Sequence, residues 1–182
     1  MLTREQTAPN DLEAFWMPFT ANRHFKAHPR LITRAEGMHY VMTDGRRLLD
    51  ATAGLWCCNA GHANPRIVEA IRAQAAELDF APSFQWGHPK SFALASQLAH
   101  LFPGDLDHAF FTNSGSESVD LAVMIARAAT SSESIFTFSE GYHGGTFLTK
   151  FSTGLNTWHA PVEAPPEIFY ITTPECVTCS HR

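Results

Sequence analysis

An alternation of short apolar strands with longer helices constrains this chain more than any other feature. Apolar residues recur at helical spacing in three stretches of ten or more residues, which begin at Pro65, Pro89 and Ser116. Three short apolar runs are typical of strands: His108–Thr112, Ser134–Ser139 and Ile168–Ile171. Strands that alternate with helices of this length predict a parallel sheet. We therefore expect an α/β fold, with a mainly parallel sheet and helices on its faces.

Each predicted helix has one apolar face that we expect to point inward. Asn64 supports the start of the first helix, since it is a good N-cap residue directly before a proline. The residues expected to face inward on the three helices are Ile67, Ala70, Ile71, Ala75 and Leu78; Phe92, Ala95, Leu98 and Leu101; and Val119, Ala122, Val123 and Ala126.

The first 60 residues do not share this alternation. We predict an irregular arm over residues 1–28, with one helical turn around Asp11–Trp16, and then a hairpin in which Asp44-Gly45 forms a type I′ turn. We assign residues 1–60 to an N-terminal arm and small-lobe hairpin, and residues 61–182 to the front part of a larger ligand-binding domain. The last thirty residues are rich in proline and end without a closing helix, so we expect an N-terminal portion of a longer protein.

Composition argues against several classes of partner. The formal net charge of -5 and the pI of about 6 predict no basic surface for nucleic acid. The first sixteen residues lack the apolar core of a signal peptide, and no apolar run has the length of a membrane span. Cys57, Cys58, Cys176 and Cys179 form no disulfide framework, and the histidines are scattered without the spacing of metal ligands. We expect a cytoplasmic protein without a metal site.

The turn N-S-G-S-E at residues 113–117 has two interpretations. It leads from a predicted strand into a helix, whose free N–H groups and positive dipole end attract an anion. Gly115 lets the backbone approach closely, and Ser114 and Ser116 add hydroxyl donors, so the turn can bind a phosphate. Alternatively, one of the two serines only caps the helix. The position beyond the end of a strand, where open α/β sheets bind ligands, favours the phosphate site.

A second glycine-rich loop, Gly141–Gly145, follows the next predicted strand. Its glycines flank Tyr142 and His143, which suits a loop that presents an aromatic face and an imidazole to a ligand. An ordinary glycine-rich turn with a surface tyrosine is the alternative. Because the two loops follow adjacent strands, they can converge on one ligand with a phosphate and a flat ring, such as pyridoxal phosphate.

With these motifs the chain resembles the class III (omega) aminotransferases, which are pyridoxal-phosphate enzymes of fold type I. The resemblance is closest to the omega-amino acid:pyruvate (beta-alanine:pyruvate) branch. The segments that carry it are FWMPFTANR (15–23), DGRRLLD (44–50), AGLWCCNAGH (53–62), APSFQWGHP (81–89), GDLDHAFFTNSGSESVD (104–120) and GYHGG (141–145). The tail, with PPEIFY and C-x-x-C, is more similar to 4-aminobutyrate-type members of the class.

The resemblance implies a homodimer that moves an amino group from an omega-amino acid or amine to pyruvate or a similar keto acid. The residues it assigns to the cofactor pyridoxal 5'-phosphate are Ser114, Gly115 and Ser116 at the phosphate, Tyr142 over the ring and His143 beside it. The residues it assigns to the substrate are Trp56, Phe84 and Phe19. Without the resemblance, Trp56 can equally be a buried core residue.

The resemblance also implies that the Schiff-base lysine and the carboxylate that pairs with the pyridine nitrogen lie downstream of this chain. The lysines present are Lys26, Lys90 and Lys150, and none lies in the motif of the catalytic lysine. We therefore assign no catalytic residue and expect the chain to be inactive alone. Two alternatives remain: a 4-aminobutyrate-type enzyme, which can share a metal cluster at Cys176 and Cys179, and a non-catalytic module that binds the phosphate group.

Overall fold

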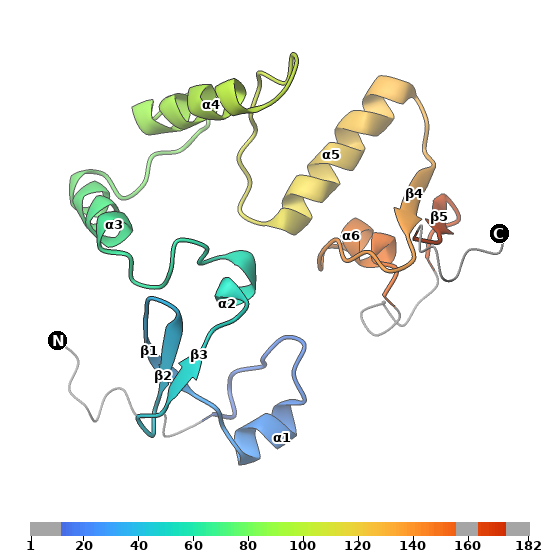
Figure 1. Cartoon of the computed structure of the whole chain (residues 1–182). Coiled ribbons are helices and arrows are strands. Elements are labelled where there is room, and N and C mark those ends of the chain that lie inside the picture. Colours follow the sequence, from blue (N-terminus) through green and yellow to red (C-terminus); the bar gives the residue numbers. More distant parts are fainter. Residues whose placement is uncertain (1–11, 156–163, 174–182) are drawn as a thin grey trace. The chain divides into compact units, whose positions relative to one another are not determined.

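The computed structural model describes residues 12–155 and 164–173 (Figure 1). The chain divides into two compact units. Unit 1 is Met1–Gly87 and unit 2 is His88–Arg182. We describe each unit by itself. The domain division at residue 60 stays a prediction. Cys176 and Cys179 of the C-x-x-C motif lie outside the described ranges, so the metal cluster considered for them also stays a prediction.

A three-stranded antiparallel sheet is the main feature of unit 1. Its strands are β1 (Ile32–Glu36), β2 (His39–Met42) and β3 (Arg47–Leu49), in that order. The predicted hairpin between the second and third strands is confirmed, with Val41 paired to Arg47. The first strand, β1, falls just after the predicted irregular arm and was not predicted.

The turn of this hairpin differs from the type I′ prediction. The Gly45 N–H donates to the carbonyl oxygen of Met42 at 3.0 Å, and the Met42 N–H donates to that of Arg46 at 2.9 Å. Gly45 has a φ of 85°, whereas Asp44 is not among the residues with positive φ, which a type I′ turn requires at both central positions. The loop therefore has three residues, with glycine in the left-handed position, and the Asp44 carboxylate binds the Arg46 N–H at 3.0 Å.

Three helices complete unit 1: α1 (Asn22–Ala27), α2 (Ala53–Trp56) and α3 (Pro65–Glu77). α3 begins as predicted, because the Asn64 side chain accepts a hydrogen bond from the Arg66 N–H at 3.1 Å. The predicted helical turn around Asp11–Trp16 is wrong for its described part, which holds only a turn at residues 13–14. The helix of the arm is α1 instead. The side chain of its first residue, Asn22, accepts a hydrogen bond from the Met17 N–H and donates one to the Met17 carbonyl oxygen.

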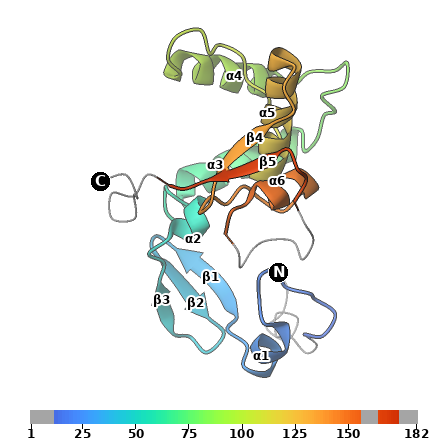
Figure 2. The ribbon, with the colours of Figure 1, turned by 90° about the vertical axis from the view of Figure 1, so that its right-hand side faces the viewer.

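Unit 2 contains α4 (Pro89–Leu101), α5 (Gly115–Thr130), β4 (Ile135–Phe138), α6 (Phe147–Ser152) and β5 (Ile168–Ile171). β4 and β5 pair in parallel, with Ile135 opposite Ile168, and α5 contacts α6 (Figure 2). The helices at 89 and 116, both strands and their parallel pairing were predicted from the sequence, and the fold class is α/β as expected. The helix α6 was not predicted.

The predicted strand His108–Thr112 is wrong. These residues form no strand, and the ring of Phe110 is 76% exposed. A strand exists only through hydrogen bonds to a neighbouring strand, and the described residues offer none to this segment.

Burial is concentrated around β4, β5 and α6. Phe151 and Ile168 are buried there, beside the buried hydroxyl residues Thr137, Thr149 and Thr153. The helix faces predicted to point inward are largely exposed, including Ile71 on α3 and Phe92 on α4, while Val119 and Val123 on α5 are half-buried. The described core is therefore small and lies under the loop that follows β4.

Candidate functional site

The first turn of α5 is held by its own side chains. Ser114 is the N-cap residue, and its Oγ accepts a hydrogen bond from the Glu117 N–H at 3.2 Å. In return, the Glu117 carboxylate accepts one from the Asn113 N–H at 2.7 Å. This reciprocal pair resembles a capping box. The alternative in which a serine caps the helix is thus correct for Ser114.

The cap still leaves room for an anion. The N–H groups of Gly115 and Ser116 have no acceptor within the part of the chain that the structure describes. Both belong to the positive end of a sixteen-residue helix. Free N–H groups at such an end attract an anion by hydrogen bonding and by the helix dipole. The cap therefore uses other N–H groups of this turn than those that an anion would bind.

The glycine-rich loop 141–145 reaches this turn directly. The Gly145 N–H donates to Ser116 Oγ at 3.0 Å, which joins residues 29 positions apart in the sequence. Gly144 is buried and has a φ of 131°, and a Cβ placed on it would lie 2.7 Å from the Ser116 Cβ. Only glycine fits this contact without a shift of the backbone. The structure thus brings Ser116 and the loop together, as the sequence predicted.

His143 anchors the loop to the buried hydroxyl groups. Thr137 Oγ1 donates to the carbonyl oxygen of Ser152 at 2.7 Å, so its only proton is used there. His143 Nε2 lies 3.0 Å from Thr137 Oγ1 and must therefore carry a proton and donate it to this hydroxyl oxygen. The His143 N–H also donates to Thr153 Oγ1 at 3.1 Å. The ring is thus oriented by β4 and α6, and its assignment to the cofactor stays a prediction.

Tyr142 lies on the same loop and is half-exposed. The loop begins directly after β4, where the Gly141 N–H donates to the carbonyl oxygen of Phe138 at 3.0 Å. A Cβ on Gly141 would lie 2.7 Å from His143 Nε2, so this glycine allows the anchoring histidine to fold back. Tyr142 is therefore presented at the carboxyl end of a parallel strand, where α/β sheets bind ligands.

These residues fit a ligand that has both a phosphate and an aromatic ring. The anion would be bound by two backbone N–H groups and by the Ser116 hydroxyl, whose oxygen accepts from Gly145 and whose proton is available to donate. Tyr142 supplies a half-exposed ring on the adjacent loop. The sequence did not identify Thr137 and Thr153 as parts of this site, because buried hydroxyl residues carry no motif; only their place beside His143 shows their role.

The residues predicted to border the substrate lie in unit 1. Trp56, Phe84 and Phe19 are 81%, 78% and 59% exposed. Their assignment to the substrate stays a prediction. Within the described residues Trp56 is thus not packed in a core.

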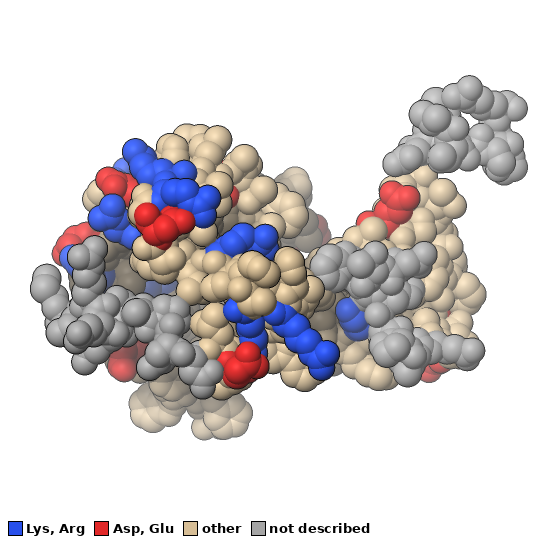
Figure 3. All heavy atoms as spheres, turned by 90° about the horizontal axis from the view of Figure 1, so that it is seen from below, with Lys and Arg blue, Asp and Glu red and all other residues tan. Residues whose placement is uncertain are grey.

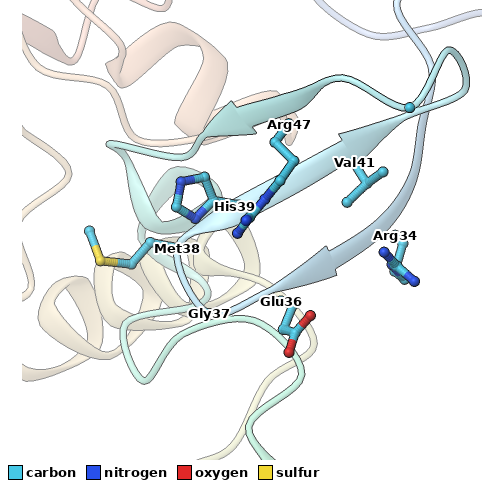
Figure 4. A pocket seen from close by; sticks show the side chains of 8 residues that line it. Arg34, Glu36, Gly37, Met38, His39, Val41 and Arg47 are labelled. Atoms are coloured by element: carbon cyan, nitrogen blue, oxygen red, sulfur yellow. The ribbon is translucent and has the colours of Figure 1, made fainter.

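The described residues also form a hollow outside unit 2. A hollow of about 700 Å³ lies on the three-stranded sheet, where Arg47 lies beside His39, Arg34 lies nearer Val41, and Glu36 adds the opposite charge (Figure 4). On the face shown in Figure 3, basic and acidic side chains of the described residues are interspersed. Within the described parts of the chain, no three His, Cys, Asp or Glu side chains form a group that could hold a metal ion. No described helix has the length and apolar character needed to cross a membrane.

Comparison with known proteins identifies related enzymes. The family model described as aminotransferase class-III matches residues 20–177. An omega-aminotransferase of Caulobacter vibrioides is 54% identical over 144 residues, which are 76% of this chain and 33% of the relative. An omega-amino acid–pyruvate aminotransferase of Pseudomonas putida is 48% identical, over 80% of this chain and 34% of its own length. A rice mitochondrial gamma-aminobutyrate transaminase is 35% identical, over 81% of this chain and 30% of its own length.

Solved structures that resemble this chain are also transaminases. The omega-transaminase of Pseudomonas jessenii, in complex with PMP, has a TM-score of 0.84 and 28% identity, over 91% of this chain and 39% of that chain. The chain spans about a third of the length of the curated relatives that it matches.

The contact between Gly144 and Ser116 generates a prediction about ligand binding. Gly144→Ala should force the loop away from α5, because the added Cβ overlaps Ser116 and the φ of 131° is unfavourable for alanine. We expect the affinity for pyridoxal phosphate to fall about tenfold or more, the loss typical of a charge-assisted hydrogen bond. Fluorescence titration of the purified protein with pyridoxal phosphate measures it.

Gly145→Ala is the matched control. A Cβ on Gly145 meets nothing within 4 Å, and alanine keeps the N–H that binds Ser116. It should bind pyridoxal phosphate like the wild type. Equal affinities for Gly144→Ala and wild type would show that the loop and the helix do not act together.

Proposed function

The chain belongs to the class-III aminotransferase family, and on that premise we propose that the protein transfers an amino group from an omega-amino acid or amine to pyruvate or a similar keto acid. Enzymes of this class depend on pyridoxal phosphate. The observation that carries the proposal is the hydrogen bond between Gly145 and Ser116, since it joins the phosphate motif and the ring motif in one site.

Each residue of the site has a defined task in this proposal. The N–H groups of Gly115 and Ser116 and the hydroxyl of Ser116 hold the phosphate, Tyr142 covers the ring, and His143 keeps the loop in place. Pyridoxal phosphate supplies an electron sink for the carbon that exchanges its amino group. Trp56, in unit 1, borders the substrate and limits its size.

Pyruvate is the acceptor that the relatives favour. The Pseudomonas putida relative, whose name includes pyruvate, is 48% identical, whereas the gamma-aminobutyrate transaminase of rice is 35% identical. The 4-aminobutyrate-type reaction is the second candidate, supported by that weaker relative, and the substrate tests below distinguish the two.

Transamination is best tested in a chimera, because the chain spans a third of its relatives. The chain replaces the aligned third of the Caulobacter vibrioides omega-aminotransferase, which is 54% identical. We expect the chimera to transfer amino groups from beta-alanine and 1-phenylethylamine to pyruvate, measured as alanine formed by chromatography. Within it, Tyr142→Phe should retain cofactor affinity, whereas Tyr142→Ala should lose ring contacts of about 0.5–1.5 kcal/mol, or roughly two- to tenfold.

The substrate pair also decides between the candidates. Faster transfer from 4-aminobutyrate to 2-oxoglutarate than from beta-alanine to pyruvate would favour the second candidate. A folded chimera that binds pyridoxal phosphate but transfers no amino group with either pair would support the non-catalytic module instead.

We also propose that the protein is a homodimer. Trp16, Phe84 and Trp86 are 86%, 78% and 76% exposed, and none of them lies on a regular helix or strand. Large aromatic residues exposed on irregular segments are typical of protein interfaces. Sedimentation velocity of the chimera at micromolar concentration should give a dimer. A dimer that persists when Phe84 and Trp86 are both replaced by serine would argue against these residues as the contact.

A further inference from the structure

The segment α2 is one turn of left-handed helix. All four of its residues have a positive φ, between 50° and 67°, and the turn is closed by the Trp56 N–H, which donates to the carbonyl oxygen of Thr52 at 3.0 Å. A left-handed helix brings the Cβ of an L-residue too close to the following carbonyl oxygen. Ala53, Leu55 and Trp56 therefore hold this conformation against their own preference, and other contacts must stabilise it.

The carboxylate of Asp50 accepts four hydrogen bonds at the start of this turn. Its Oδ1 accepts from the N–H and the hydroxyl of Thr52, both at 3.1 Å. Its Oδ2 accepts from the Gly54 N–H at 2.7 Å and from His62 Nε2 at 2.6 Å. The Asp50 side chain is 3% exposed, so water does not compete for these bonds. The bond from His62 is the main cause that holds the pKa of Asp50 well below its usual range, with the Thr52 and Gly54 amides adding to it against the effect of burial.

His62 connects this carboxylate to the three-stranded sheet. Its backbone exchanges two hydrogen bonds with Gly37, at 2.8 and 3.0 Å. Its ring lies with its centroid 4.5 Å from that of Tyr40 on β2. The Asp50 N–H donates to the carbonyl oxygen of Met38 at 2.8 Å. The Asp50 and His62 side chains are therefore both fixed to the sheet, and through them the left-handed turn is fixed as well.

We infer that Asp50 is a positioning residue: it holds Trp56 in place through the left-handed turn, and this sets the size of the amine that the site accepts. The inference rests on the proposed function, in which Trp56 borders the substrate. Trp56 is the last residue of the turn and is 81% exposed, so its direction depends on the backbone of the turn more than on packing. A turn that relaxed to right-handed helix would move the indole away.

Hydrogen exchange tests the structural half of this inference in the chain itself. Asp50→Asn keeps the shape of the side chain but removes the charge and replaces one acceptor oxygen by a donor. We expect the Gly54 and Trp56 N–H groups to exchange about tenfold faster or more, the loss expected for a charge-assisted hydrogen bond. Amide exchange followed by NMR measures it. Thr52→Val, which removes a single hydroxyl, should give a smaller change in the same direction.

Asp44→Asn is the matched control. Asp44 is also in unit 1 and also binds a backbone N–H and a basic side chain, but it does so in the hairpin turn with Arg46. Its substitution should leave exchange at Gly54 and Trp56 unchanged. If Asp44→Asn accelerates this exchange as much as Asp50→Asn does, the effect is a general loss of stability and the inference fails.

Kinetics in the Caulobacter chimera test the functional half. Asp50→Asn should leave the affinity for pyridoxal phosphate unchanged and should change the ratio of kcat/KM for 1-phenylethylamine to that for beta-alanine by about tenfold, as expected when one wall of a pocket moves. Adding Leu55→Gly should restore part of the wild-type ratio, because glycine adopts a positive φ without strain. Leu55 is 67% exposed, so removal of its side chain costs little packing.

The two halves can fail separately. Unchanged exchange at Gly54 in Asp50→Asn would contradict the role of Asp50 in the turn, even in an active chimera. An unchanged kcat/KM ratio in an active Asp50→Asn chimera would contradict its role in amine selection. A wild-type chimera without transaminase activity would contradict the proposed function, while the exchange measurement would still decide whether Asp50 holds the turn.

Discussion

The contact between Gly144 and Ser116 is the constraint on which the candidate site depends. It allows the loop after β4 to lie against the first turn of α5, where the Gly145 N–H reaches Ser116 Oγ at 3.0 Å. Without this approach the free N–H groups of α5 and the ring of Tyr142 would belong to two separate surfaces. With it, a phosphate and an aromatic ring can be bound by neighbouring groups of one ligand site.

The same helix end can combine two roles that the sequence presented as alternatives. Ser114 and Glu117 satisfy the N–H groups that a capping box uses, and they leave those of Gly115 and Ser116 for an anion. Two histidines in the family motifs, His143 and His62, have structural roles. His143 and His62 each donate through Nε2 to a buried oxygen, so both hold the backbone of the loop in which they lie.

Local signals in the sequence predicted the elements that begin with a clear cap or proline. Asn64-Pro65 and His88-Pro89 mark the starts of α3 and α4, and the Ser114 cap marks α5. The failures depend on distant partners: residues 108–112 look like a strand but have no described neighbour to pair with, and the helix faces of α3 and α4 stay exposed. The left-handed turn at Ala53–Trp56 could not be predicted either, because only Gly54 in it favours a positive φ and the Asp50 contacts that hold it come from the fold.

In the proposed function, the first turn of α5 and the loop 141–145 form one phosphate-binding site. Backbone amide NMR of the ¹⁵N-labelled protein, titrated with inorganic phosphate and then with pyridoxal phosphate, tests it most directly. We expect phosphate to shift the amide signals of Gly115, Ser116 and Gly145 together, with one dissociation constant, and pyridoxal phosphate to shift that of Tyr142 in addition. Saturable shifts at other residues, with Gly115 and Ser116 unaffected by either ligand, would contradict it.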